Sequence, residues 1–236
     1  MRIGNTLTAP VDKPAARWLP VYEKLRDAII DHRLLPGRKL PEDELASIYD
    51  VGRSVVRAAL QALAHDGLAK LEPNRGAFVA QPSPREAREV FEARALIEPR
   101  VASMAAQRAD ARAISALRAH LVREHEALAG GHQRDAILLS ARFHVGIAEI
   151  ADHRVLTEIV TDLVSRSSLI VALYWQRRDA TCERHAHSAL VDALAAGKER
   201  EAAELMTSHL IDLLSGLNLS GREPGAEKLD DLLGGR

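Results

Sequence analysis

Three histidines in the second half of the chain carry the clearest metal-binding chemistry in the sequence. His144, His187 and His209 each stand three, four or seven residues from apolar residues of their own segment, which places each on the apolar side of a helix. Neutral imidazoles from neighbouring helices suit Zn²⁺, Ni²⁺ or similar ions, and the core of a helical bundle is a common place for such a site. The alternative is that each is a hydrogen-bonded core residue. The pattern therefore predicts three inward histidines and leaves metal-binding and structural roles open.

Neighbouring ionisable residues do not extend this set. His185 is two residues from His187, about 200° around a helix, so at most one of the pair faces the interior. Asp135 and Glu149 are close to His144 in sequence but lie on other sides of the predicted helix. We therefore expect neither carboxylate to be a ligand.

A second set of candidate residues consists of arginines near the N-terminus. Arg53 and Arg57 are four residues apart, so both project from the free side of one helix, away from its apolar stripe. A guanidinium group suits two-point contact with guanine and also neutralises phosphate. The alternative is a solvated surface charge, and Arg57 could equally form a salt bridge with Asp50 or Glu44. The spacing favours a surface that contacts DNA.

Further residues complete the predicted DNA-contacting set. Ser54 is expected to cap the same helix, and its hydroxyl could also bond a phosphate. Arg75 and Gly76 stand at the tip of a predicted hairpin, where a cation would come close to the DNA backbone or minor groove. Arg38 is also included in the set.

A series of helices and one hairpin must position these residues. Apolar periodicity and turn residues predict helices at 21–32, at 41–50 and from 54 to the stop at Asp66-Gly67, followed by strands at 68–72 and 77–81. This order is the plan of a winged helix-turn-helix. Beyond Pro82-Ser83-Pro84 the sequence is almost entirely helical, with helices predicted at 85–108, 110–129, 133–151, 153–176, 180–196 and 199–217.

The composition sets limits on the class of protein. The 236 residues suffice for two domains, and 47% apolar residues with only 3% aromatics favour packed amphipathic helices. No stretch approaches about 18 consecutive apolar residues, and residues 1–20 lack the apolar core of a signal peptide, so we expect a cytoplasmic protein without a membrane span. The single cysteine, Cys182, excludes an internal disulfide. Residues 1–82 carry 12 Lys/Arg against 10 Asp/Glu, and residues 83–236 carry 20 against 23, a weak asymmetry that permits a local phosphate-binding patch.

Residues 21–81 resemble the DNA-binding domain of the GntR family. The matching residues are Leu35-Pro36-Gly37, Leu40-Pro41, Glu44-Leu45-Ala46, Val51-Gly52-Arg53-Ser54-Val55-Val56-Arg57-Ala58-Ala59-Leu60, Leu63, Asp66-Gly67-Leu68 and Pro73-Asn74-Arg75-Gly76-Ala77-Phe78-Val79. Three positions depart from the family pattern, because Gly52, Val55 and Ala58 stand where serine, proline and glutamate are usual. None of these departures removes an arginine.

The resemblance implies a role for each basic residue of this domain. Arg53, Arg57 and Arg75 would contact DNA, and Gly76 would let the wing approach it closely. A homodimer would place two such helices against a palindromic operator in double-stranded DNA.

Residues 85–217 resemble the FCD ligand-binding domain of the FadR subfamily of GntR regulators. The matching segments are Arg94-Ala95-Leu96-Ile97-Glu98-Pro99, Phe143-His144, His187-Ser188-Ala189-Leu190-Val191-Asp192-Ala193-Leu194 and Met206-Thr207-Ser208-His209-Leu210. Metal-binding members use an aspartate one turn before the first of three histidines, and the histidines match His144, His187 and His209. Ser140 stands at the aspartate position, and a serine hydroxyl is a poor ligand without charge. We expect a divalent transition metal such as Zn or Ni; weaker binding, a water in the carboxylate's place and an empty site are the alternatives.

The resemblance also implies a small carboxylate effector near the metal. Arg94 and Arg166 are the candidates for its negative end, because a guanidinium pairs with a carboxylate in a two-point geometry. Ser140 is included among the effector-binding residues. The alternative for both arginines is an interhelical ion pair.

We therefore expect a mainly α protein with an N-terminal winged helix-turn-helix and a C-terminal all-α bundle of the FCD type. The expected divisions are an arm at 1–19, a DNA-binding domain at 20–82, a helical effector-binding and dimerisation domain at 83–220 and a tail at 221–236. The expected function is transcription regulation, with repression relieved by the effector. Two classes compete: an enzyme with a catalytic zinc on the three histidines, which would lack a paired general base, and a helical scaffold with an inert second domain.

Overall fold

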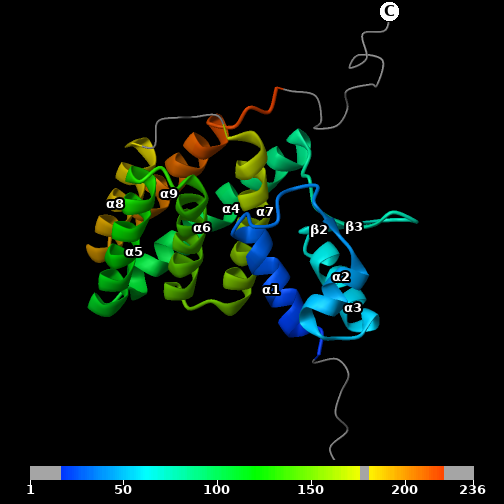
Figure 1. The fold of residues 1–236 in the computed structure, drawn as a ribbon. Helices are drawn as coiled ribbons and strands as arrows, with labels where there is room; N and C mark the ends of the chain where they lie inside the picture. Colours follow the sequence, from blue (N-terminus) through cyan, green and yellow to red (C-terminus); the bar gives the residue numbers. More distant parts are fainter. Residues whose placement is uncertain (1–16, 176–180, 221–236) are drawn as a thin grey trace, which may run out of the picture.

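A computed structural model of the chain describes residues 17–175 and 181–220. Most of the predicted arm (1–19), the whole predicted tail (221–236) and the side chain of Cys182 lie outside the described residues. The described part is mainly helical with one small sheet, which confirms the predicted fold class (Figure 1). Below, its residues up to Pro82 are called the head, and those from Ser83 onward are called the sensor.

The head combines short helices with a small antiparallel sheet. Its elements are α1 (Leu19–Ile30), β1 (Lys39–Leu40), α2 (Glu42–Tyr49), α3 (Arg53–His65), β2 (Ala69–Glu72) and β3 (Gly76–Val79). The strands lie in the order β1-β3-β2, and Phe78 of β3 pairs with Lys39 on one side and Lys70 on the other. The β2–β3 hairpin extends away from the helices as a wing (Figure 1). Strand β1 was not predicted, because two residues are too few to show a period.

Helix α3 packs by the stripe that the sequence predicts. Val56, Ala59, Leu60 and Leu63 are all buried, and they join residues of α1 and the sheet in one apolar cluster. Burial of this stripe leaves the opposite side of α3 toward solvent, because residues three and four apart share one side of a helix.

The predicted cap of α3 was wrong. The residue before the helix is Gly52 in an extended conformation, and the helix begins at Arg53 without a side-chain cap. Ser54 therefore lies inside the first turn with an exposed side chain. The cap position lies two residues earlier than expected, at Gly52, because glycine is accepted at a helix N-cap without a side-chain hydroxyl.

The sensor is a helical bundle whose first helix starts at the proline boundary. The Ser83 hydroxyl accepts a hydrogen bond from the Glu86 amide at 3.2 Å, and Pro84 occupies the first turn, where its missing amide costs nothing. The helices are α4 (Pro84–Arg108), α5 (Ala111–Ala129), α6 (Gln133–Ile150), α7 (Arg154–Tyr174), α8 (Thr181–Ala195) and α9 (Glu199–Ser215). Helix α4 contacts α6, α7, α8 and α9 and forms the centre of the bundle.

Helix α7 is the sensor element that holds the head. Leu169 is fully buried and belongs to the apolar cluster of the head. Arg166 Nε donates to the Asp66 carbonyl, which follows α3, at 3.1 Å. His32, just after α1, places Nε2 3.0 Å from the Ser168 hydroxyl and 3.2 Å from the Ser168 carbonyl. Residues 166–169 of α7 therefore make several of the contacts that hold the head.

Candidate functional site

The three predicted histidines meet at one buried point. His144 comes from α6, His187 from α8 and His209 from α9, and they are 2%, 0% and 3% exposed. Nε2 of His209 is 3.0 Å from Nε2 of His187 and 3.3 Å from Nε2 of His144. Among the described residues these are the histidine, cysteine and carboxylate groups whose donor atoms gather closely enough to hold a metal ion. We call this group the histidine triad.

Two buried glutamates set the orientation of two of these rings. Nδ1 of His144 is 2.6 Å from Glu98 Oε2, and Nδ1 of His187 is 2.9 Å from Glu124 Oε1. An ionised carboxylate only accepts hydrogen bonds, so both rings donate from Nδ1 and present a bare lone pair at Nε2. A carboxylate behind the imidazole is the arrangement that metal-ligating histidines commonly show.

The donor set fits a divalent metal ion. The two lone pairs of His144 and His187 face His209, whose Nε2 can carry a single proton and so cannot satisfy both. With Zn–N bonds of about 2.0–2.1 Å, neighbouring ligands of a tetrahedral ion lie about 3.3 Å apart. The observed separations are close to that value, and three ligands leave a position for water or another molecule. The triad could therefore hold a metal ion.

Burial favours the unprotonated, metal-binding form of two rings of the triad, His144 and His209. Burial lowers the pKa of His144, Glu98 opposes this shift, and Arg94 adds to it. Burial also lowers the pKa of His209 well below its ordinary value, and the two other histidines act in the same direction. Burial alone would raise the pKa of Glu98, but Arg94 and His144 lower it to about 2. The Glu98 carboxylate is therefore ionised beside a neutral His144 ring.

Sequence reasoning missed Glu98 and Glu124 as partners of the triad. Each lies on a helix that supplies no histidine to the triad, α4 for Glu98 and α5 for Glu124. Glu124 stands three and seven residues after the buried Leu121 and Leu117, so a carboxylate interrupts an apolar stripe. A buried carboxylate needs a partner, and that interruption was the available signal.

The predicted effector residues fall at different places. Arg94 is buried beside the triad, where Nε is 2.5 Å from Glu98 Oε1 and Nη1 donates to the Ser167 hydroxyl at 2.9 Å. Its ion pair is therefore within α4, and a hydrogen bond links it to α7. Arg166 lies at the head. Ser140 is partly buried on α6, one turn before His144.

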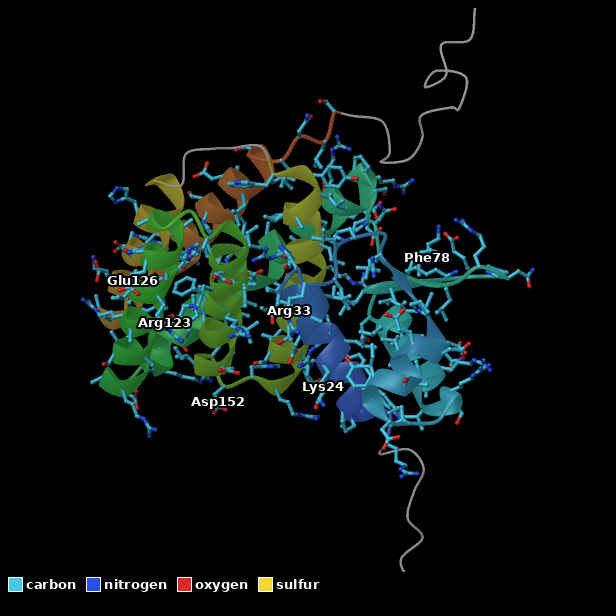
Figure 2. The ribbon with its side chains drawn as sticks, viewed as in Figure 1. Lys24, Arg33, Phe78, Arg123, Glu126 and Asp152 are labelled. Carbon is cyan, nitrogen blue, oxygen red and sulfur yellow. The ribbon has the colours of Figure 1, made fainter. Side chains whose placement is uncertain are left out.

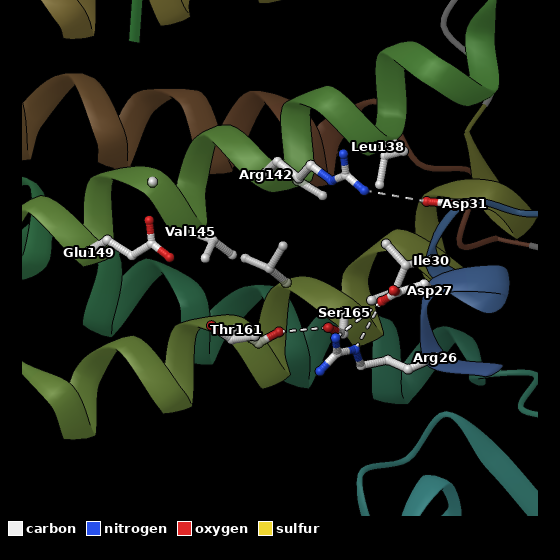
Figure 3. A pocket seen from close by; sticks show the side chains of 13 residues that line it. Arg26, Asp27, Ile30, Asp31, Leu138, Arg142, Val145, Glu149, Thr161 and Ser165 are labelled. Carbon is white, nitrogen blue, oxygen red and sulfur yellow. Dashed lines mark hydrogen bonds and ion pairs between the residues drawn. The ribbon is translucent and has the colours of Figure 1, made fainter. Parts of the chain in front are cut away.

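The other ionisable neighbours of the triad lie elsewhere. His185 is exposed while His187 is buried, as expected for residues about 200° apart. Asp135 and Glu149 are exposed and outside the cluster of candidate ligands. Glu149 lines a separate pocket on another side of α6 (Figure 3).

That pocket lies between the head and the sensor. It has a volume of about 360 Å³ and is enclosed by the residues Arg26, Asp27, Ile30 and Asp31 of the head and by Leu138, Ala141, Arg142, Val145, Gly146, Glu149, Thr161, Val164 and Ser165 of the sensor (Figure 3). Arg142 reaches across it to Asp31, with 3.9 Å between the charged atoms. Helices α1 and α6 are therefore separated by this space, while α1 packs on α7.

The predicted reading helix presents its arginines to solvent. The side chains of Arg53 and Arg57 are 70% and 61% exposed. Arg53 Nε is 2.5 Å from Asp43, and Arg57 donates to Glu42 from Nε at 3.0 Å and from Nη2 at 2.7 Å. The partner of Arg57 is thus neither Asp50 nor Glu44. Such exposed ion pairs contribute little stability, so both guanidinium groups can exchange a carboxylate for phosphate or base.

The wing carries a further exposed arginine. Arg75 pairs with Glu72 and lies over the Phe78 ring, 5.4 Å from its centroid, on the projecting hairpin (Figure 2). Gly76 has φ +97°, which favours glycine at this point of the tip. Arg38 is exposed where the chain enters the sheet. Arg53, Arg57 and Arg75 thus lie on the helix and hairpin that a winged helix-turn-helix uses.

Comparison with known proteins agrees with both halves of this structure. The family model "Bacterial regulatory proteins, gntR family" matches residues 19–79, and the FCD domain model matches residues 89–212. The chain belongs to the GntR family and carries an FCD domain. The predicted GntR and FCD assignments are confirmed.

Similar proteins of the GntR type are transcription regulators. The Nta operon transcriptional regulator of Aminobacter aminovorans is 27% identical over 183 residues, which cover 77% of this chain and 85% of the relative. The transcriptional repressor RspR of Escherichia coli K12 is 29% identical over 143 residues, covering 61% and 63%. A crystal structure of a GntR regulator from Rhodococcus sp. RHA1 is 27% identical with a TM-score of 0.74, covering 85% of this chain and 96% of the other.

This GntR-family chain is accordingly a DNA-binding transcription regulator with an effector-binding FCD domain, and not an enzyme. The prediction of a non-catalytic protein is confirmed by these relatives. In the described ranges 17–175 and 181–220, no helix combines the length and the apolar character needed to cross a membrane.

Proposed function

We propose that this GntR-family protein is a homodimeric repressor of the FadR subfamily, released from its operator by a small carboxylate. The effector would bind at a metal ion held by the histidine triad. The observation that carries the proposal is the buried meeting of three Nε2 atoms with glutamate carboxylates behind two of the rings. Such a site lies in the same chain as an exposed arginine-bearing helix.

The triad's chemistry favours Zn²⁺ or Ni²⁺. Three imidazole nitrogens suit these ions, and the lowered pKa values of His144 and His209 leave these two rings free to bind an ion near neutral pH. Ser140 brings no charge to the position where an aspartate would stand, so the remaining coordination is left to water or to the effector. A bound ion would supply positive charge for a carboxylate at that position.

Arg94 supports an anionic effector beside the triad. Its guanidinium is held in place by Glu98 and Ser167 and brings a fixed positive charge into a buried region. A carboxylate that enters this region exchanges hydration for that charge and for the metal. Arg94 and Ser140 are therefore the proposed effector-binding residues near the triad. Arg166, which the sequence also suggested, lies at the head and is the weaker candidate.

Exposed apolar side chains on two packed sensor helices support a homodimer. Leu96 on α4 is 82% exposed, and Val155 and Ile159 on the neighbouring α7 are also exposed. Exposure of the apolar Leu96 side chain to water costs free energy, and packing against a second copy of the sensor would remove that exposure. Two copies would bring two α3 helices to the half-sites of a palindrome.

Metal analysis together with DNA binding tests the proposed function. Purified protein should contain one Zn or Ni per chain, and His187→Ala should lose it while the protein stays folded and dimeric. Small carboxylates should raise the melting temperature of the wild type and weaken its binding to a duplex selected from a random pool. Stoichiometric metal in His187→Ala would overturn the triad assignment. Wild-type DNA affinity that no carboxylate in a broad panel changes would overturn the effector class.

A further inference from the structure

A continuous line of buried polar contacts leads from the histidine triad toward the head. It begins at Nδ1 of His144, which is 2.6 Å from Glu98. The same Glu98 carboxylate pairs with Arg94, whose Nη1 reaches the Ser167 hydroxyl on α7 at 2.9 Å. Glu98 is thus bonded on one side to a proposed metal ligand and on the other to the cation that contacts α7.

The next residues of α7 make the contacts with the head. Ser168 is bonded to His32 through both its hydroxyl and its carbonyl, at 3.0 and 3.2 Å. Leu169 fills the apolar cluster of the head, and Arg166 donates to the Asp66 carbonyl. Of the four consecutive residues 166–169, Ser167 therefore contacts Arg94 on the side of the triad. The other three contact the head.

Burial makes these contacts dependent on one another. Arg94, Glu98, Ser167, Ser168 and His32 are all buried. A buried ion pair that loses one partner leaves an uncompensated charge, so a change in the position of Glu98 forces Arg94 to follow. Arg94 in turn donates to Ser167, whose hydroxyl donates to the Val164 carbonyl of its own helix at 2.9 Å. A shift at the triad is in this way passed to α7.

The pocket between the head and the sensor leaves space into which the head can move. Helix α1 packs on α7, but on the side of α6 the pocket of about 360 Å³ separates the two parts (Figure 3). The ion pair across this pocket, Arg142 with Asp31, has its charged atoms 3.9 Å apart and an exposed arginine. A head that is fixed at α7 and open toward α6 can rock about α7 at little cost in buried contacts.

We propose that Glu98, Arg94 and Ser167 form a relay that couples occupancy of the triad to the position of the head, with residues 166–169 of α7 as its output. The inference rests on the proposed function and adds the route of its regulation. With an ion bound, His144 would hold it through Nε2 and its ring would be fixed. Glu98 would then be fixed through Nδ1 of His144, and Arg94 would carry that position to α7. Arg94 and Ser167 are then positioning residues, and their effect is on the response to metal.

A single hydroxyl provides the sharpest test. Ser167→Ala removes the contact with Arg94 without touching the triad or the head. Ser165→Ala is the matched control, because Ser165 lies two residues earlier on the same helix, lines the pocket and bonds only to the Thr161 carbonyl among the described contacts. The measurement is the ratio of duplex affinities with and without Zn²⁺, using a duplex selected by the wild type, together with the Zn²⁺ affinity of each protein.

The relay predicts a distinct pattern of results. In the wild type, Zn²⁺ should change duplex affinity by about 5- to 150-fold, the usual range of coupling between sites. Ser167→Ala should keep its Zn²⁺ affinity within about threefold, while its ratio falls toward one. Ser165→Ala should keep the wild-type ratio. Ser168→Ala, which cuts the hydroxyl contact to His32, provides a second variant at the head end and should also lower the ratio.

Each other outcome overturns a defined part of this scheme. A wild-type ratio in both Ser167→Ala and Ser168→Ala would overturn the relay and leave the proposed function standing. Loss of Zn²⁺ binding in Ser167→Ala would make the serine a structural support of the triad and overturn the relay. A wild type that binds Zn²⁺ without any change in duplex affinity would also overturn it. A wild type that binds no divalent metal would overturn the proposed function itself.

Discussion

Glu124 lies on the far side of the His187 ring from the nitrogen that faces His209. Its carboxylate accepts from Nδ1 at 2.9 Å, while Nε2 on the opposite edge is 3.0 Å from Nε2 of His209. The contact spans 63 residues of sequence and joins α5 to α8. The ring is therefore fixed by a group that does not itself take part in the triad.

Replacing that carboxylate should weaken metal binding without removing a ligand. In Glu124→Gln the amide oxygen can still accept from Nδ1, but the negative charge that raises the basicity of the ring is lost. We expect Zn²⁺ affinity to fall by about 10- to 100-fold. Competition with a chromophoric chelator measures it. Glu126→Gln, exposed on the same helix, is the matched control and should bind as the wild type does. Equal affinities in both variants would remove Glu124 from the site.

The stability of the metal-free protein should depend on pH in a defined direction. The pKa of His209 is lowered in the folded state, so the unfolded chain takes up the proton first as the pH falls. This contribution to the free energy of unfolding is complete above about pH 6.5, the ordinary histidine value, and is lost below it. Urea unfolding between pH 8 and pH 5 measures the decline.

A variant pair isolates the histidine responsible for that decline. His209→Gln should flatten the fall in unfolding free energy between pH 7 and pH 5, because the buried titrating ring is gone. His185→Gln, which changes an exposed histidine of the same sensor, should follow the wild-type curve. A wild-type slope in His209→Gln would mean that other groups cause the acid sensitivity.

The exposed arginines of α3 should contribute to DNA binding. Arg53→Ala and Arg57→Ala should each weaken binding to a selected duplex by about 1–3 kcal/mol if they contact bases. A residue that contacts phosphate should instead reduce the slope of log affinity against log salt by about one. Fluorescence anisotropy at several salt concentrations separates the two cases.

A control for these variants should also be an exposed, ion-paired arginine. Arg118 has a side chain that is 60% exposed and pairs with Asp192 at 2.8 Å. It belongs to α5, which lies at the opposite end of the molecule from α3 (Figure 1). Arg118→Ala should leave both affinity and salt slope unchanged. Wild-type binding by the double variant Arg53→Ala/Arg57→Ala would exclude α3 as the reading helix.

The exposed Leu96 of α4 should govern assembly. Leu96→Glu introduces a charge at the most exposed of the described large apolar side chains, and burying it against a second copy would be costly. We expect sedimentation equilibrium to show a monomer where the wild type is a dimer. Val122→Glu, on the exposed side of α5, serves as a comparison that should stay dimeric. A dimeric Leu96→Glu protein would place the interface elsewhere.

Sequence periodicity predicted the elements well where burial follows a single helix. The stripe of Val56, Leu60 and Leu63 located α3, and the side of α8 that holds Leu190 and Leu194 turned His187 inward. These predictions depend only on residues a few positions apart, which share a side of the helix through its geometry. Strand β1 has no such pattern, because its place is decided by pairing with β3.

The parts of the site that were missed depend on contacts between distant helices. Glu98 and Glu124 meet their histidines across 46 and 63 residues, and no local spacing encodes which carboxylate faces which ring. Arg166 was predicted from its residue type to bind an effector. Its position on α7 instead brings it to the Asp66 carbonyl of the head. Residue type indicated the chemistry, and packing between helices decided the partner.

The packing of Leu169 into the head limits how the two parts of the protein can be exchanged in evolution. The hydrophobic interior of the head is completed by a side chain that the ribosome adds about a hundred residues after α3. A fragment that stops at Pro82 would have a cavity in its apolar core where Leu169 packs. A chimera with a foreign sensor would need an equivalent apolar side chain at that place. Recombination between regulators of this architecture should therefore favour exchanges that carry α7 together with the head it fits.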